Sequence, residues 1–262
     1  MLFLRSLLFN IAFYVNLTIV MVFGLPTMLS GRAAILDLAR VWARRTFWLL
    51  DKICGIKVEF RGVEHLSQTG CIIAAKHQST WETFALTTQV HDFTFILKLE
   101  LTKIPLFGQY LVRSNQIAID RASRGAALKD LVEQAGAALA EGRAIFIFPD
   151  GTRRAAGAPP AYKSGVAHLY GATHAPCVPV ALNSGLFWPR GGFLRRPGTI
   201  VVEYLPVIEA NLPKAEFARI LQERIETATN RLIAEALAKD PSLAVNLEKL
   251  PRKTDLETAK AD

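Results

Sequence analysis

A long apolar run near the N-terminus constrains this chain more than any other feature. From Leu7 to Leu29 the sequence is almost wholly apolar, interrupted only by two asparagines, a glycine, a proline and threonines. An apolar helix of about 20 residues can cross the hydrocarbon core of a bilayer. We therefore expect a membrane helix, and both a spanning form and one that enters a single leaflet fit these residues. The alternative is a cleaved signal peptide with Arg5 as its basic region, but the run is long and has no clear A-x-A site.

A second, amphipathic stretch follows the apolar run and carries several cations. It combines hydrophobic residues and two tryptophans with Arg32, Arg40, Arg44 and Arg45. Positive charge beside a membrane helix favours the cytoplasmic side, and tryptophan favours the headgroup level. We expect a helix at the membrane interface here. The rest of the protein should then lie on the cytoplasmic face of the inner (plasma) membrane.

The overall composition indicates contact with lipid and with an anion. Hydrophobic residues make up 51% of the 262 residues, and 31 Lys and Arg outnumber 23 Asp and Glu. A basic surface attracts anionic lipid, phosphorylated substrates or nucleic acid. Nucleic-acid binding needs interleaved aromatic and basic residues, and because the sequence has no such run we expect no nucleic-acid partner. The three cysteines are widely spaced, so neither a disulfide framework nor a metal site is expected.

Short apolar runs alternate with helical periodicity after Ile56. This alternation predicts an α/β domain whose mostly parallel sheet is covered by helices, preceded by the membrane-associated helical segment. The expected organisation is an N-terminal anchoring segment at 1–55, a catalytic domain at 56–240 and a polar, disordered tail at 241–262. The predicted strands are Cys71–Ala75, Phe93–Leu97, Gln116–Ile119, Ala144–Phe148, Val178–Leu182 and Thr199–Tyr204, and the predicted helices are Trp81–Gln89, Ser123–Glu141 and Pro213–Lys239.

A histidine at the exit of one predicted strand is the first candidate for chemistry. The motifs G-x-S-x-G, H-E-x-x-H and G-x-G-x-x-G are missing from the sequence, which disfavours serine hydrolases, zinc proteases and nucleotide-binding folds. His77 follows Cys71–Ala75, and imidazole is suited to taking a proton from an alcohol when a carboxylate orients it. Glu82 could be that carboxylate. Ser79 and Glu82 also have the spacing of a helix capping box, and spacing alone favours the cap.

Further polar clusters end other predicted strands. One is Ile119-Asp120-Arg121, for which a surface ion pair is the ordinary interpretation, and another is Phe148-Pro149-Asp150-Gly151-Thr152-Arg153, where Asp-Gly marks a turn. Arginine suits bidentate binding of phosphate. A last one, Val178-Pro179-Val180, is most simply a strand with an edge or bulge proline.

Taken in order, these clusters resemble the PlsC-type glycerolipid acyltransferases, a family that includes 1-acylglycerol-3-phosphate acyltransferases. The family pattern is H-x4-D, an arginine-ended strand, F-P-E-G-T-R and V-P. A K-x-E-L…P…G stretch is matched from Lys98 to Gly108, and the resemblance covers roughly Val58 to Leu205. The chain departs from the pattern twice, with Glu82 in place of aspartate and Asp150 in place of glutamate. Both changes keep the charge.

The resemblance implies a reaction and a set of site residues. His77 would be the general base and Glu82 its partner, and no acyl-enzyme, cofactor or metal would be needed. Acyl-CoA or acyl-carrier protein would donate the fatty acyl group to the free hydroxyl of 1-acylglycerol-3-phosphate in the membrane, giving phosphatidic acid in phospholipid biosynthesis. The alternatives are acylation of another lyso-lipid, such as lyso-ornithine lipid, and an inactive lipid-binding protein of the same fold. The residues implied in substrate binding are Lys98, Arg121, Asp150, Gly151, Thr152 and Arg153.

Overall fold

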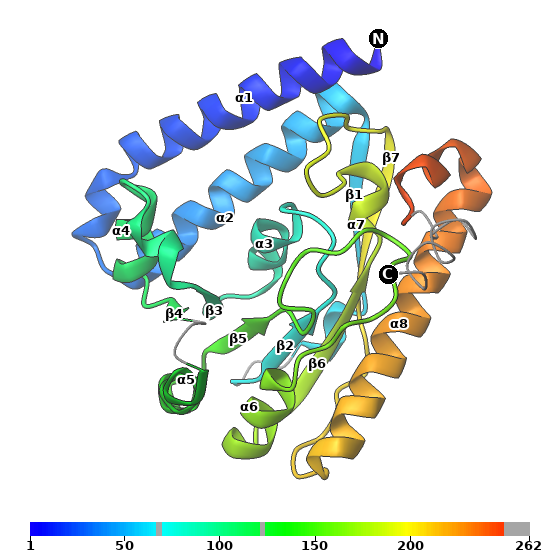
Figure 1. The fold of residues 1–262 in the computed structure, drawn as a ribbon. Helices are drawn as coiled ribbons and strands as arrows, with labels where there is room; N and C mark the ends of the chain where they lie inside the picture. Colours follow the sequence, from blue (N-terminus) through cyan, green and yellow to red (C-terminus); the bar gives the residue numbers. More distant parts are fainter. Residues whose placement is uncertain (67–69, 121–123, 249–262) are drawn as a thin grey trace, which may run out of the picture.

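The computed structural model describes residues 1–66, 70–120 and 124–248, and these residues form a sheet with helices on both faces (Figure 1). Within them the sheet has seven strands in the order β1-β7-β6-β2-β5-β3-β4. Neighbours pair in parallel except β6 and β7, which are antiparallel. The strands are β1 (Ile56–Arg61), β2 (Ile72–Ala75), β3 (Phe93–Lys98), β4 (Ile117–Ile119), β5 (Ala144–Ile147), β6 (Cys177–Leu182) and β7 (Gly198–Tyr204).

The sheet separates two layers of helices. The helices are α1 (Leu2–Phe23), α2 (Arg32–Leu49), α3 (Glu82–Ala85), α4 (Phe107–Arg113), α5 (Arg124–Ala140), α6 (Gly165–Thr173), α7 (Ser184–Phe187) and α8 (Lys214–Lys239). Shorter 3-10 turns are η1 (Leu25–Met28), η3 (Val63–His65), η4 (Leu86–Gln89), η5 (Leu99–Lys103) and η7 (Pro241–Asn246), and η2 (Leu50–Cys54) is a π turn. Helices α1, α2 and α3 lie on one face, and α5, α6 and α8 on the other (Figure 1).

Side chains of the central strands point alternately to the two faces of the sheet, and each face has a hydrophobic core. In β2, Ile73 and Ala75 join the core under α1–α3, whereas Ile72 and Ala74 join the core under α5, α6 and α8. Successive side chains of a strand point to opposite faces, so a strand covered on both sides must be apolar throughout. All four residues of β2 and of β5 are buried. This is the α/β architecture predicted from the sequence.

Two polar residues of helix α1, Ser6 and Asn10, face the protein, whereas Arg5 and Thr18 are exposed. Ser6 Oγ accepts a hydrogen bond from the backbone N–H of Arg195 at 2.9 Å, and Asn10 Oδ1 accepts one from the Arg195 guanidinium at 3.2 Å. Arg195 is buried and lies over the Trp188 ring, and burial lowers the pKa of its guanidinium to about 10. The helix is long and apolar enough to cross a membrane, with a mean hydropathy of 2.0, and 22% of its most apolar window is buried. Its outward residues include Leu4, Leu8, Ile11, Val15, Ile19 and Val22.

Helix α2 lies further inside the molecule than its sequence predicts. Its Trp42 ring packs between the protein body and α1, 4.8 Å from Phe84 and 5.6 Å from Phe13. Arg40, expected at the lipid headgroups, is buried and donates to the carbonyl of His91 at 2.7 Å. The prediction of an interfacial helix with all its cations toward lipid is therefore wrong for this arginine, because the Asp37 carboxylate and two backbone carbonyls of the domain take up its charge. Arg44 and Arg45 are exposed.

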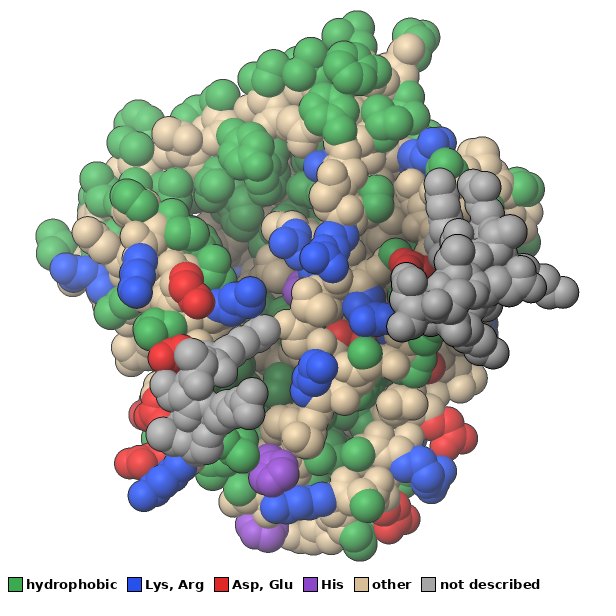
Figure 2. Space-filling model, in the orientation of Figure 1, with side chains coloured by type: hydrophobic (Ala, Val, Ile, Leu, Met, Phe, Trp, Pro, Cys, Tyr) green, Lys and Arg blue, Asp and Glu red, His purple; other side chains and the backbone are tan. Residues whose placement is uncertain are grey.

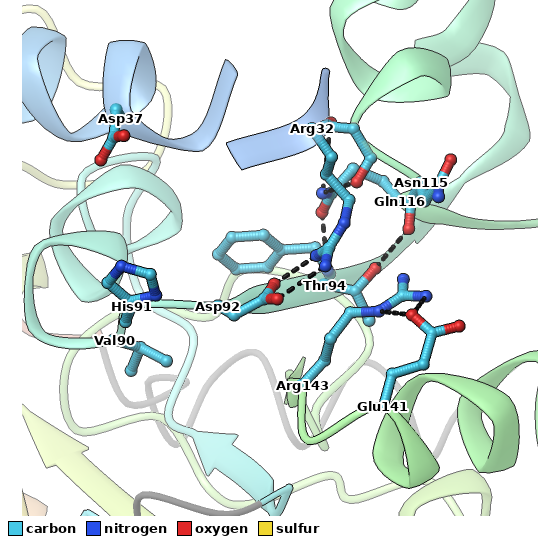
Figure 3. A network of polar contacts seen from close by, with 12 residues as sticks. Arg32, Asp37, Val90, His91, Asp92, Thr94, Asn115, Gln116, Glu141 and Arg143 are labelled. Carbon is cyan, nitrogen blue, oxygen red and sulfur yellow. Dashed lines mark hydrogen bonds and ion pairs between the residues drawn. The ribbon is translucent and has the colours of Figure 1, made fainter. Parts of the chain in front are cut away.

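A bidentate ion pair fastens the start of α2 to the sheet. Figure 3 shows Arg32 directed at both carboxylate oxygens of Asp92, the residue before β3, and one of these contacts measures 2.6 Å. Close by, Gln116 accepts from the backbone N–H of Phe95 at 2.7 Å and holds β3 beside β4. Arg32 was also expected to face lipid, so this is a second correction to the sequence interpretation. Two-point pairing fixes the direction of a guanidinium as well as its position.

The ordered chain continues past Pro241, where the sequence predicts a tail. Leu243 in η7 is buried, and Asn246 donates to the carbonyl of Leu186 at 2.7 Å. The predicted tail is therefore wrong for residues 241–248, because one leucine and a few backbone contacts dock this segment. Residues 249–262 lie outside the described residues.

Pro179 lies in the middle of the sheet. Its strand β6 runs between β2 and β7, so the edge position considered for it is wrong. The proline has no N–H to donate, but its carbonyl still accepts from the N–H of Leu205 at 2.9 Å. The antiparallel register shifts by one residue between the Val180–Tyr204 pair and the Cys177–Ile208 bridge, which is a bulge beside the proline.

Two glycines should respond in opposite ways to alanine. A Cβ on Gly108 in α4 would lie 1.9 Å from the carbonyl oxygen of Thr102 in η5, whereas a Cβ on Gly136 in α5 would meet nothing within 4 Å. Gly108→Ala should lower the free energy of unfolding by about 1–3 kcal/mol or more through overpacking. Gly136→Ala should raise it by about 0.5–1 kcal/mol through helix propensity. Chemical denaturation of both variants checks this, and a stable Gly108→Ala protein would contradict the close approach of α4 to η5.

Candidate active site

Polar side chains gather at one edge of the sheet. Strands β2, β3, β4, β5 and β6 run in the same direction, so the residues that follow them lie at the same edge. His77 follows β2, Asp150 follows β5 and Ser184 follows β6. This edge, outside the carboxyl ends of parallel strands, is where open α/β sheets build their sites.

His77 and Glu82 form the contact that the sequence predicts. His77 Nδ1 lies 2.9 Å from Glu82 Oε1, and the imidazole is 13% exposed while the carboxylate is fully buried. The His77 ring stacks on Phe148, with centroids 4.0 Å apart and planes inclined by 19°. The described residues provide no partner for Nε2. A histidine held at Nδ1 by a carboxylate and open at Nε2 is arranged as a general base.

The glutamate half of the predicted capping box is also formed, although helix α3 itself begins at Glu82 with Trp81 as its N-cap residue. Glu82 Oε1 accepts from the backbone N–H groups of Gln78 at 2.7 Å and of Ser79 at 2.6 Å. The reciprocal half differs, because Ser79 Oγ accepts from Trp81 N rather than from Glu82 N. The contacts expected of the two interpretations, one to His77 and one to the backbone of the loop, therefore coexist at Glu82. The same oxygen that closes the loop before α3 also faces His77.

Ser184 completes the surroundings of the carboxylate, and the sequence analysis missed it. Its hydroxyl donates to Glu82 Oε2 at 2.8 Å, and the residue is fully buried. Glu82 lies between Ser184 and His77, so the order Ser–Glu–His differs from that of a serine nucleophile activated by histidine. A polar residue directly after a predicted strand was the one available signal for Ser184.

Asp150, in the turn after β5, belongs to a buried ionic cluster. Lys76 Nζ contacts Glu226 Oε1 of α8 at 2.7 Å and Asp150 Oδ2 at 3.5 Å. Tyr162 donates to Glu226 Oε1 at 2.9 Å, and burial raises the pKa of its phenol, with the Glu226 charge acting in the same direction. Asp150 is therefore turned inward, toward lysine. Lys76, Tyr162 and Glu226 were not among the predicted site residues, and Glu226 is far away in sequence.

Gly151, Thr152 and Arg153 form the outward part of the same turn. Gly151 has φ +66°, a left-handed conformation that favours glycine, and its N–H donates to the carbonyl of Phe148 at 2.9 Å. Thr152 is exposed, and Arg153 donates to the Thr80 hydroxyl on the loop that carries His77. Arg153 is thus placed at the mouth of the histidine site.

Lys98 and Arg121 are the other cations predicted at the site. Arg190 donates to the carbonyl of Arg153 at 2.8 Å and adds a cation that the sequence analysis did not identify. Lys98 is exposed at the carboxyl end of β3. Arg121 lies outside the described residues. Figure 2 shows Lys and Arg side chains gathered in the middle of this face of the molecule, below a ridge of hydrophobic side chains.

The three cysteines are free and buried. Cys54, Cys71 and Cys177 are at most 1% exposed. Burial raises the pKa of Cys54 to about 11 and also raises the pKa of Cys177. Buried thiols with raised pKa values are poor nucleophiles.

Comparison with known proteins agrees with this geometry. The family described as "Acyltransferase" matches residues 57–183, the part of the chain that carries His77, Glu82, Lys98 and Arg153. A 1-acyl-sn-glycerol-3-phosphate acyltransferase of Pseudomonas aeruginosa is 35% identical over 213 residues, which is 81% of this chain and 83% of that protein. This chain belongs to the PlsC-type acyltransferase family. The family and the fold class predicted from the sequence are therefore confirmed.

A plant relative and a solved structure are also similar to this chain. The 1-acyl-sn-glycerol-3-phosphate acyltransferase of the plant Limnanthes alba is 32% identical over 159 residues, covering 60% of this chain and 56% of that protein. The crystal structure of the PlsC acyltransferase from Thermotoga maritima superposes with a TM-score of 0.75 over 88% of this chain and 98% of that one. At 24% sequence identity, that likeness supports the fold.

Replacing Glu82 by glutamine separates its two contacts. Glutamine keeps an oxygen for the N–H groups of Gln78 and Ser79, but it has no charge to stabilise an imidazolium at His77. Glu82→Gln should leave the melting temperature nearly unchanged and lower kcat by about 100-fold or more, within the range of general-base catalysis. Steady-state kinetics and a thermal melt of the same preparation check this. Wild-type turnover in Glu82→Gln would reduce the carboxylate to a cap.

Proposed function

We propose that this protein is a 1-acyl-sn-glycerol-3-phosphate acyltransferase, which transfers a fatty acyl group to the free hydroxyl of its acceptor and forms phosphatidic acid. The observation that carries the proposal is the His77–Glu82 pair, buried on the carboxylate side and open at Nε2. The family and the activity named for the Pseudomonas relative support the same reaction.

His77 acts as general base in the proposed reaction. Nε2 takes the proton of the acceptor hydroxyl while its oxygen attacks the carbonyl carbon of the acyl thioester. The new C–O bond forms, the C–S bond breaks, and the leaving thiolate takes the proton back from the imidazolium. Glu82 stabilises the imidazolium between these two transfers. The step needs neither an acyl-enzyme nor an external oxidant or reductant.

Cations hold the phosphate of the acceptor. Arg153 stands on the turn beside the histidine loop, and guanidinium binds phosphate through two parallel hydrogen bonds. Lys98 and Arg121 are proposed to assist it, with the backbone of Gly151 and Thr152 shaping the pocket. Asp150 contributes from behind, because its carboxylate is buried against Lys76 and fixes the turn from inside.

The outer face of α1 is proposed to bind the membrane. Its exposed side is mostly apolar, and Ser6 and Asn10 are engaged with Arg195, so the helix meets lipid without leaving the domain. Each large apolar side chain buried from water contributes about 1.5–3 kcal/mol. We place the catalytic domain on the cytoplasmic side, where acyl-CoA or acyl-carrier protein can approach the basic surface.

Outward substitutions on α1 test this contact with lipid. Ile11, Val15 and Ile19 are exposed and share one face of the helix. Changing the three to aspartate should move the protein from the membrane to the soluble fraction, with little change in melting temperature. Phe9→Ala is the matched inward control, because Phe9 is fully buried and its loss should lower the melting temperature. Full membrane retention of the triple variant would contradict the proposal.

A lyso-lipid panel tests the reaction itself. Purified protein in mixed micelles is given 1-acylglycerol-3-phosphate, lyso-ornithine lipid or monoacylglycerol, with acyl-CoA or acyl-carrier protein as donor, and products are identified by mass. Phosphatidic acid should form, and His77→Ala should reduce its rate by about 100- to 10,000-fold. Exclusive acylation of another lyso-lipid would replace the proposed acceptor. Turnover by His77→Ala at the wild-type rate would refute the mechanism.

Arg153 should read the phosphate of the acceptor. Arg153→Ala should raise the KM for 1-acylglycerol-3-phosphate about tenfold or more, because a charge-assisted pair is lost, while the KM for the acyl donor changes little. Initial rates at varied acceptor and donor give both constants. Arg219→Ala, an exposed arginine on α8, serves as the matched control. An equal effect of Arg153→Ala on a neutral monoacylglycerol acceptor would argue against phosphate recognition.

A further inference from the structure

The carboxylate of Glu82 is held on two sides. On one side Oε1 meets His77 Nδ1 and the backbone N–H groups of Gln78 and Ser79. On the other side Oε2 accepts from the hydroxyl of Ser184 at 2.8 Å. Ser184 is fully buried and stands 102 residues further along the chain, at the start of α7.

We propose that Ser184 is a positioning residue for acyl transfer, which holds the Glu82 carboxylate so that its other oxygen faces His77. The inference rests on the proposed function of His77 and Glu82. Ser184 keeps its proton and forms no covalent bond. It acts through Glu82 and does not touch the reacting atoms.

The length of the Glu82 side chain makes the hydrogen bond from Ser184 necessary. Glutamate has one more rotatable bond than the aspartate of the family pattern, and the last torsion of its side chain has a broad, shallow preference. The backbone N–H groups and His77 all bind Oε1, so they define one oxygen and leave rotation about it open. The donor at Oε2 fixes the second point and therefore the plane of the carboxylate. Without it, a buried charged oxygen has no described partner.

The backbone around Ser184 is fixed on both sides. Gly185 N donates to the side-chain oxygen of Gln78 at 2.9 Å, which ties the start of α7 to the histidine loop. Asn183 Oδ1 accepts from Val201 N at 2.9 Å, which ties the same point to β7. A Cβ on Gly185 would lie 3.1 Å from Gln78 and 3.3 Å from Ala156 N, so this approach is close. The position of the Ser184 hydroxyl is thus fixed both by strand β7 and by the loop that carries His77.

Ser184→Ala is the first test. Loss of a hydrogen bond to a charged group should lower kcat about tenfold, with the KM values for acceptor and donor within about twofold of wild type. Ser184→Cys nearly keeps the size of the side chain but has a weaker donor, so its kcat should lie between those of wild type and Ser184→Ala. This variant keeps the test decisive if the alanine variant folds poorly. Ser114→Ala is the matched control, since Ser114 is a buried serine that donates to the carbonyl of Tyr110. Its kcat should stay at the wild-type value.

A double-mutant cycle separates positioning from general support of the fold. In a Glu82→Gln background the charge that Ser184 orients is gone, so adding Ser184→Ala should lower kcat by less than about twofold. An equal tenfold loss in both backgrounds would overturn the proposal, as would wild-type kcat in Ser184→Ala or Ser184→Cys. Failure of the proposed function would look different, because His77→Ala would then retain turnover whatever Ser184 does.

Discussion

The buried carboxylate of Glu82 is the interaction on which the site depends. It is fully buried and receives four donors, namely His77 Nδ1, the N–H groups of Gln78 and Ser79, and the hydroxyl of Ser184. A charge taken out of water is costly unless its hydrogen bonds are replaced. The domain satisfies it only when the loop after β2, helix α3 and the exit of β6 are all in place. The orientation of His77 is therefore a result of folding and precedes any substrate.

Two neighbouring residues after β2 follow the alternation of that strand and perform separate tasks. Lys76 continues the face of Ile72 and Ala74 toward α8, where Glu226 and Asp150 receive its charge. His77 continues the opposite face, beside Phe148 and Glu82. Because consecutive side chains leave a strand on opposite sides, the lysine points away from the histidine. It instead contacts Asp150 in the turn that carries Arg153, so one short segment supports both the proposed base and the turn proposed to bind phosphate.

The sequence could predict what is local and could not predict what is distant. Short apolar runs predicted six of the seven described strands to within one residue at each end, but not β1 (Ile56–Arg61). His77 and Glu82 are close enough in sequence for their contact to be expected. Ser184 and Glu226 act across 102 and 150 residues, so only the finished sheet brings them to the site. The inward turn of Arg40 was missed for a related reason. Its near partner is Asp37, three residues earlier, but the groups that draw it inward are the carbonyls of Val90 and His91, and backbone acceptors leave no mark in a sequence.

The N-terminal helices belong to the support of the site as well as to the surface proposed to meet lipid. Phe84 follows Glu82 by two residues in α3, and its ring contacts Phe13 of α1, Trp42 of α2 and Trp188. The helix that carries the dyad carboxylate is therefore packed between the sheet and α1–α2. If α1 left the domain to cross a bilayer alone, Ser6 and Asn10 would lose Arg195 and α3 would lose part of its cover. Polar groups without partners are costly in hydrocarbon, so the inward placement of these two residues favours a helix that contacts lipid while docked. In the proposed reaction, this arrangement keeps the acceptor hydroxyl and the general base on the same side of the sheet.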